Sequence, residues 1–190
     1  MAPPAFLAPL GGVIDLLKGD RAGVAKLGAA TTPGLVASFL IPGLLLIPAY
    51  SLLVSERFEA LNLDPTIGEI LVVEPIAYLI GWTLFPVLSH LYCERIGKTR
   101  EWYDYVAAYN WSNILQMALY LPAALIAEGG MPVALMFVLS VGILAATVGI
   151  HFRLARMVLR VDALPAMVLV AIDLGGSVLL ARLVERLYAN

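Results

Sequence analysis

Long apolar stretches alternate with short polar segments along this chain. The apolar stretches cover residues 33–54, 70–92, 105–127, 131–152 and 163–183. Because a helix needs about 20 apolar residues to cross the hydrocarbon core of a bilayer, each stretch predicts one membrane span. The sequence therefore predicts an all-α, polytopic membrane protein with five transmembrane helices, in a single transmembrane domain that covers residues 1–190.

The N-terminal segment, residues 5–30, has a different pattern. Apolar residues recur at helical spacing and charged residues take other angles: Phe6, Leu10, Val13, Ile14 and Leu17 against Asp15, Lys18, Asp20 and Arg21. This pattern is typical of an amphipathic helix that lies in the membrane interface, and we place it at about residues 5–18. A short helix packed beneath the bundle would show the same pattern, so both interpretations stay open.

Prolines and polar runs shape the connections between the spans. Pro42 and Pro48 lie inside the first stretch and predict a kink there, because proline removes a backbone donor. The polar run at residues 55–66 predicts a loop. Glu128-Gly129-Gly130 leaves room only for a tight turn, so the third and fourth spans are expected to be antiparallel neighbours.

The positive charges predict the orientation of the chain. With five spans, nine of the twelve Lys and Arg residues fall on one side, namely Lys18, Arg21, Lys26, Arg95, Lys98, Arg100, Arg153, Arg156 and Arg160, and three on the other, namely Arg57, Arg182 and Arg186. The positive-inside rule then places the N-terminus in the cytoplasm and the C-terminus outside. The excess of Arg over Lys, with much Ala and Leu, indicates a bacterial inner membrane.

Composition supports a membrane protein and excludes several other classes. Hydrophobic residues make up 61% of the chain and charged residues 14%, with a mean hydropathy of +0.90, whereas soluble domains hold about 45–50% and about 25%. The net charge of −2 leaves no basic surface for nucleic acid. One cysteine, Cys93, and two distant histidines, His90 and His151, give no metal-ligand spacing, so we expect no metal site and no cofactor.

A polar stripe makes the third span unusual. Its members share one helical face of about 100°: Trp102, Tyr105, Tyr109, Ser112, Asn113, Gln116 and Tyr120. Such a face avoids lipid, so it must point at other helices or at a water-filled crevice. Interhelical hydrogen bonds that fix the packing are one interpretation. A crevice for a solute or a lipid headgroup is the other.

Asp173 lies near the middle of the fifth span, where a carboxylate is expensive and should face the bundle interior. A proton relay or cation site is the functional interpretation. A protonated Asp173 hydrogen-bonded to Asn113 or Gln116 would instead meet a purely structural need, and no Lys or Arg within a span offers a counter-charge. The candidate intramembrane polar site thus comprises Asp173, Asn113, Gln116, Tyr109 and Tyr120.

The other titratable residues are interpreted as interfacial. Glu74 precedes Pro75 at the outer end of the second span, and His90 and His151 fall at the inner ends of the second and fourth spans. In the fourth span, Gly142, Ala146 and Gly149 form a stripe of small residues that predicts a packing seam. Arg153, Arg156 and Arg160 continue that span into the cytoplasm and are candidate contacts for anionic lipid, although a topology signal explains them equally well.

Catalytic motifs are missing. The sequence has no phosphate-binding Gly-x-x-x-x-Gly-Lys, no Gly-x-Ser-x-Gly, no His-Glu-x-x-His and no Cys-x-x-Cys, so we expect no enzyme. Inverted repeats, which many transporters contain, are not visible either.

Two segments carry a family resemblance: Tyr78-Leu-Ile-Gly-Trp-Thr-Leu-Phe-Pro86 in the second span, and Tyr105-Val-Ala-Ala-Tyr-Asn-Trp-Ser-Asn113 at the start of the third. With five spans and a cytoplasmic amphipathic N-terminus, the chain resembles bacterial members of the Yip family. Eukaryotic members interact with Rab GTPases and help to shape membranes, and their Asp-Leu-Tyr-Gly-Pro segment is absent here. No catalytic residues carry over.

These observations lead to two hypotheses. The resemblance implies a non-enzymatic, membrane-organising or protein-interacting module whose partners are membrane lipids and either another protein or a second copy of the chain. The alternative is a small oligomeric transporter or channel that uses Asp173 and the polar face of the third span.

Overall fold

The computed structural model describes residues 7–128 and 132–188, and the described residues form helices joined by short connections. The helices are α1 (Leu7–Lys18), α2 (Gly23–Lys26), α3 (Thr32–Leu45), α4 (Ile47–Leu61), α5 (Ile67–Arg95), α6 (Thr99–Glu128), α7 (Val133–Leu159) and α8 (Ala163–Tyr188). The prediction of an all-α fold is therefore confirmed for these ranges.

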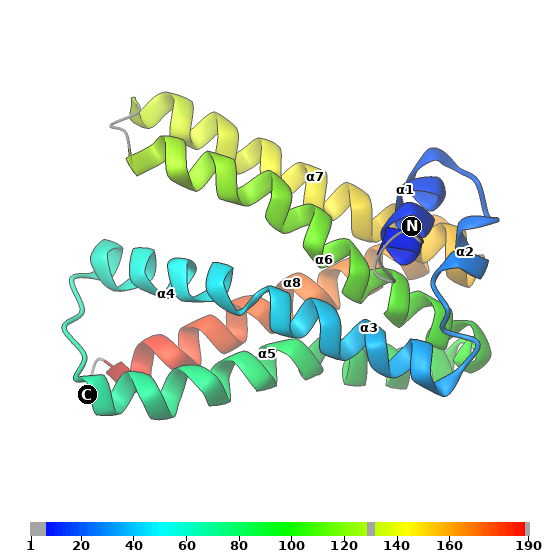
Figure 1. Ribbon diagram of the computed structural model, residues 1–190, viewed down its shortest axis with the longest axis horizontal. Helices are drawn as coiled ribbons and strands as arrows, with labels where there is room; N and C mark the ends of the chain where they lie inside the picture. The colour runs from blue at the N-terminus through cyan, green and yellow to red at the C-terminus, as the bar shows by residue number, and fades with distance from the viewer. Residues whose placement is uncertain (1–6, 129–131, 189–190) are drawn as a thin grey trace, which may run out of the picture.

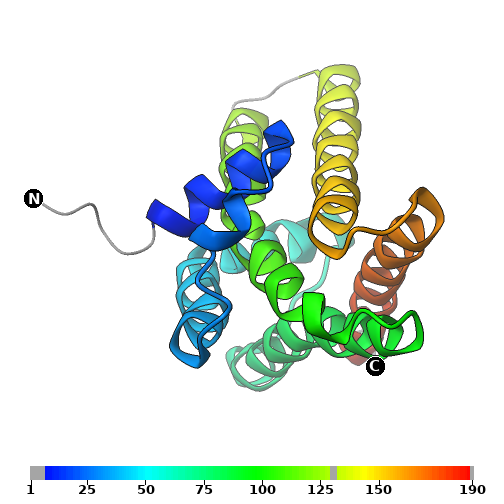
Figure 2. The same ribbon diagram turned by 90° about the vertical axis from the view of Figure 1, so that its right-hand side faces the viewer.

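The long helices run back and forth along the longest axis of the molecule (Figure 1). The bent pair α3 and α4 runs one way, α5 returns, and α6, α7 and α8 continue the alternation. The connections α5–α6 and α7–α8 lie at one end together with α1 and α2, whereas the α4–α5 connection and the end of α8 lie at the other. Viewed from the α1 end, α6 occupies the centre (Figure 2) and contacts α1, α3, α5 and α7.

Three helices, α5, α7 and α8, are long and apolar enough to cross a membrane. The pair α3 and α4 adds a fourth candidate if it forms one span, with a bend of 45° between its halves. With 30 residues α6 is long enough, but it is not among these candidates. Its polar residues lower its hydropathy, and two of them, Asn110 and Ser112, are fully buried in the bundle. The structure thus supports several membrane helices, and five spans remain a prediction.

The helix pair α3 and α4 is bent where prolines predict a kink. Helix α3 ends at Leu45 and α4 begins at Ile47, with Pro42 inside α3 and Pro48 in the first turn of α4. The polar loop expected from residue 55 begins late, because α4 continues to Leu61. Residues 55–61 include good helix formers, and polarity alone does not end a helix. Asn62, in a left-handed conformation with φ of 50°, ends it instead.

Helix α1 packs against α6 and α7. Val13 and Leu16 are fully buried, so the apolar face of α1 is turned to the protein. These contacts match the packed-helix interpretation of the N-terminal segment, while its depth relative to lipid stays a prediction. Lys26 of α2 forms an ion pair of 2.6 Å with Asp15 of α1, and this hydrogen bond raises the pKa of Lys26 above its ordinary value.

Helices α6 and α7 pack against each other as expected, but the small-residue side of α7 faces outward. The two helices contact each other and run antiparallel (Figure 1), as predicted, whereas most of the tight turn expected at residues 128–130 lies outside the described residues. The small-residue seam on α7 is wrong within this chain. A Cβ atom at Gly142 or Gly149 would meet nothing within 4 Å, because this side of α7 faces away from the other helices.

A close approach of two backbones joins α1 to α2. A Cβ atom at Gly12 would lie 2.6 Å from the carbonyl oxygen of Gly23, whereas a Cβ atom at Gly11, one residue earlier, would meet nothing within 4 Å. We expect Gly12→Ala to destabilise the α1–α2 contact by about 1–3 kcal/mol, the usual cost of overpacking. Hydrogen exchange of the α1 amides in lipid nanodiscs measures this as lost protection.

Gly11→Ala is the matched control. It adds the same methyl group to the same helix, and it should leave protection unchanged or raise it, because Ala favours a helix by about 0.5–1 kcal/mol over Gly. Equal loss of protection in both variants would mean that the Gly12–Gly23 approach is not what holds α2 on α1.

Candidate functional site

Asp173 of α8 is buried at the meeting point of α6, α7 and α8, with 8% of its surface exposed. The Tyr109 hydroxyl of α6 donates a hydrogen bond of 2.8 Å to Oδ1. Nδ1 of His151, from α7, lies 2.8 Å from Oδ2. Each carboxylate oxygen thus has a partner from a different helix, which is the arrangement that a buried carboxylate needs.

His151 extends the cluster to a second partner on α6. Its ring is 4% exposed, and Nε2 lies 2.7 Å from the side-chain nitrogen of Gln116. As placed, a neutral ring donates from Nδ1 to Asp173 and accepts at Nε2 from the Gln116 amide. A protonated ring donates from both nitrogens, so the Gln116 amide would have to turn its oxygen toward Nε2. The two arrangements differ by one proton and one amide rotation.

His151 lies inside the bundle in contact with Asp173, a pairing that the sequence does not indicate, while its depth in the membrane stays a prediction. The sequence placed the end of the fourth span at residue 152, next to the first arginine, but α7 continues to Leu159. The last eight residues of α7 add about 12 Å beyond His151 at the helical rise. His151 therefore supplies the partner for Asp173 that the sequence did not reveal.

Of the five predicted site residues, Asp173 is a member of this pair, and Tyr109, Gln116 and Asn113 lie around it. Gln116 hydrogen bonds to Ser112 at 3.2 Å and to Asn113 at 3.3 Å, both on its own helix. The expected direct bond from Asn113 or Gln116 to Asp173 is wrong, because Tyr109 and His151 take those places and Gln116 acts through His151. The fifth residue, Tyr120, lies apart and donates to Glu56 of α4.

A second polar cluster lies toward the opposite end of the bundle. Glu74 of α5, 6% exposed, accepts hydrogen bonds from Tyr50 at 2.7 Å and Tyr188 at 2.8 Å, and it forms an ion pair with Arg57. The expectation that Glu74 reaches water is wrong, while its depth relative to the membrane interface stays a prediction. Helix α5 begins at Ile67, two turns before Glu74, behind a capping box in which Thr66 is the N-cap residue.

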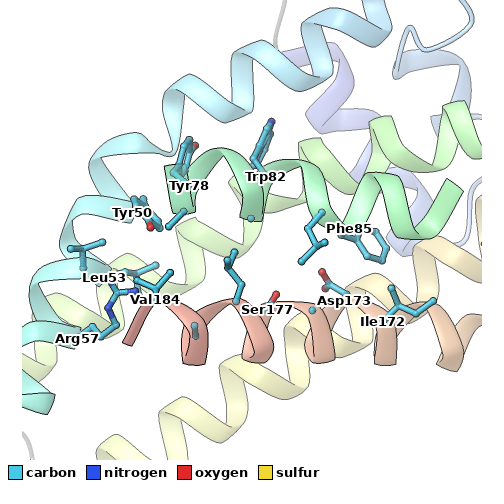
Figure 3. A pocket seen from close by; sticks show the side chains of 17 residues that line it. Tyr50, Leu53, Arg57, Tyr78, Trp82, Phe85, Ile172, Asp173, Ser177 and Val184 are labelled. Carbon is cyan, nitrogen blue, oxygen red and sulfur yellow. The ribbon is translucent and has the colours of Figure 1, made fainter. Parts of the chain in front are cut away.

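A pocket of about 500 Å³ lies between α4, α5 and α8 (Figure 3). Arg57 lies at one end of it, and Asp173 and Phe85 lie toward the other. Aromatic and aliphatic side chains form most of the walls between them: Tyr50, Leu53, Tyr78, Trp82, Ile172 and Val184. The pocket thus connects the two polar clusters through an apolar slot.

The remaining sequence candidates lie outside this region. Arg153, Arg156 and Arg160 are exposed at the end of α7, and Arg160 is a left-handed cap. His90 pairs with Glu94 at 3.4 Å, and Cys93 is buried. Within residues 7–128 and 132–188, no group of three His, Cys, Asp or Glu side chains is arranged to hold a metal ion.

The Asp173–His151 pair should be energetically coupled. His151→Leu leaves the buried carboxylate with Tyr109 alone, and we expect a loss of about 3 kcal/mol in the free energy of unfolding, as for one partner removed from a buried pair. The double variant His151→Leu/Asp173→Leu should lose less than the sum of the single losses, by about 1–3 kcal/mol. Unfolding in mixed detergent micelles, followed by tryptophan fluorescence, measures both.

His90→Gln serves as the histidine control, with an expected loss below about 1 kcal/mol because its partner Glu94 is exposed. Strict additivity of the His151 and Asp173 losses would show that the two side chains do not interact in the folded protein.

Comparison with known proteins gives no relative for this arrangement: no protein-family model matches the chain, and neither does any curated protein or any solved structure. The resemblance to the Yip family therefore stays a prediction, and function is argued from the site alone.

Proposed function

We propose that this chain is an integral membrane transporter in which the Asp173–His151 pair binds and releases a proton as the adjoining pocket fills and empties. The observation that carries the proposal is the position of this buried pair at the end of the pocket between α4, α5 and α8. Ionisable side chains inside membranes are rare and commonly mark proton relays or substrate pathways.

The electrostatics of the pair suit this role. With a neutral His151 and an ionised Asp173 the cluster carries one negative charge, and one added proton makes it neutral overall. Charges are costly in hydrocarbon, so the neutral cluster moves or repacks more easily than the charged one. Tyr109 and Gln116 hydrogen bond to the pair in either state once the Gln116 amide turns.

We also propose the topology that this role requires. The bent pair α3 and α4 forms one span, and α6 forms another whose polar residues face the bundle, which gives five spans in a bacterial inner membrane. The end that carries α1, α2 and the connections α5–α6 and α7–α8 holds nine of the twelve Lys and Arg residues (Figure 1), which favours a cytoplasmic N-terminus and an external C-terminus.

The membrane-organising hypothesis, with a protein partner or a second copy of the chain, differs on one point. It requires no titratable pair at the end of a pocket, and a structural role for Asp173 would be met by any side chain that hydrogen bonds to Tyr109. The two hypotheses therefore separate when the charge of Asp173 is removed while its shape is kept.

Proteoliposomes with an internal pH-sensitive dye test the proposal. A potential and an acidic exterior drive protons inward, with and without a small-molecule extract of bacterial cells outside to supply a coupled solute. We expect wild-type protein to acidify the vesicles and Asp173→Asn to slow this by at least about tenfold, because the pair can no longer carry the proton. His151→Gln should slow it similarly.

Asp162→Asn is the matched control, because Asp162 is exposed just before α8 and lies outside the pocket. It should retain the wild-type rate, and circular dichroism should be the same for all variants. Wild-type rates in Asp173→Asn, or no difference between wild-type and protein-free vesicles, would refute the proposal and leave the membrane-organising hypothesis.

A further inference from the structure

We propose that the pocket binds an amphipathic monocarboxylate, with its carboxylate on Arg57 and its single hydrocarbon chain along the slot toward Asp173. This inference names the ligand class of the site in the proposed function and rests on that function only for the transport of the ligand, because binding can be measured without flux.

Arg57 has a buried guanidinium donor without an acceptor. Its side chain is 20% exposed, and its Nη2 pairs with Glu74, but its Nε is buried without a hydrogen-bond partner. Buried donors normally have an acceptor, because an unsatisfied one costs about 1–3 kcal/mol. A carboxylate suits the guanidinium well, since it accepts two parallel hydrogen bonds from it.

Glu74 pairs with Arg57 but does not line the pocket. Glu74 also accepts hydrogen bonds from Tyr50 and Tyr188, so its charge is satisfied by three donors from two other helices. Glu74 therefore pairs with the guanidinium without entering the pocket. The guanidinium of Arg57 still lines the pocket end, where it can meet a ligand.

The slot is long and mainly apolar. Val184, beside Arg57, follows Asp173 by eleven residues on α8, so the slot is about 16 Å long at the helical rise. Its walls are mainly apolar, with Tyr78, Trp82 and Phe85 from α5 along one side. A volume of about 500 Å³ is that of a small-molecule site, and these walls suit a hydrocarbon chain.

The Asp173 end of the slot does not favour a ligand that carries its charged group at that end. Each oxygen of Asp173 already has a partner, Tyr109 or His151, and only 8% of the residue is exposed, so little of the carboxylate is left to meet a ligand amine. A second anionic group would meet the negative charge of Asp173. One anionic head at Arg57 and an apolar tail near Asp173 satisfy both ends.

Fluorescence quenching by a brominated fatty acid tests the proposal, because bromine quenches tryptophan only at short range and Trp82 lines the slot. The protein is held in nanodiscs of unbrominated lipid and titrated with the brominated acid. We expect saturable quenching that Trp82→Phe removes, which assigns the signal to Trp82 rather than to Trp102 or Trp111. Trp82 also lines a second pocket, between α3, α4 and α5, which Arg57 does not line, so dependence of the quenching on Arg57 places the acid in the slot. The unbrominated acid should reverse it.

Arginine variants test the anchor. Arg57→Gln should weaken the apparent affinity at least about tenfold, the loss of a charged, bidentate contact. Since this variant leaves Glu74 unpaired and could unfold, Arg57→Gln/Glu74→Gln removes both charges together and should also lose binding. Arg182→Gln is the matched control, because Arg182 lies on α8 in an exposed pair with Glu185 and does not line the slot.

Two further arms distinguish the sources of the same chemistry. A brominated alkylamine of equal chain length should quench weakly, and equal or stronger quenching would overturn the proposal in favour of an anchor at Asp173. A brominated anionic phospholipid that quenches Trp82 and is not displaced by the free acid would assign the slot to lipid. Quenching that does not saturate, or that is the same in Arg57→Gln as in the wild type, would show that the acid only partitions into the bilayer and would overturn the proposal. None of these results decides the proposed proton transport, which the flux measurement with Asp173→Asn tests separately.

Discussion

The burial of the Asp173 carboxylate is the constraint on which the arrangement of α6, α7 and α8 depends. A lone carboxylate in hydrocarbon is costly, so three helices must meet where its two oxygens find donors. Tyr109 on α6 and His151 on α7 are those donors. The registers of α7 and α8 relative to α6 are thereby fixed, because sliding either helix by one turn would separate the hydrogen-bonding atoms by about 5 Å.

The same constraint accounts for the composition of α6. Tyr109 bonds to the buried carboxylate, Gln116 reaches it through His151, and Ser112 and Asn113 bond to Gln116, so α6 is too polar to resemble an ordinary span. It lies at the centre of the bundle, packed against α1, α3, α5 and α7 and joined to α8 through Tyr109. Its fully buried residues, Tyr105, Asn110 and Trp111 among them, point in several directions around its axis. Hydropathy measures what a helix is made of, whereas central packing decides how much of it must meet lipid.

The sequence predicted the helices more accurately than it predicted the site. Long apolar stretches located α5 to α8 and the α3–α4 pair, because each such stretch in a membrane protein needs a helix. His151 and Glu74 are more buried than the sequence indicates, because charged residues do not mark the ends of these helices: α7 continues past Arg153 and Arg156, and α5 begins before Glu69. Asp173, Tyr109 and Gln116 were found because each is conspicuous in its own span. Their pairing through His151 depends on how separate helices pack, which no local pattern contains.

Helix α8 contributes a residue to each polar cluster and also forms one wall of the pocket between them. It is held to α7 by the contact of Asp173 with His151 and to α5 by that of Tyr188 with Glu74, fifteen residues further along. Between these points Gly175 has no neighbour within 4 Å of a Cβ position, and Gly176 meets only the flexible side chains of Leu84 and Leu88. The middle of α8 nevertheless packs closely against α5, because a Cβ atom at Gly176 would lie 3.3 Å from Leu84 and one at Gly81 of α5 would lie 3.2 Å from Leu180. The two polar contacts at its ends are both made by titratable side chains. A displacement of α8 along its axis would change both clusters and the slot between them at once, because all three include residues of this one helix.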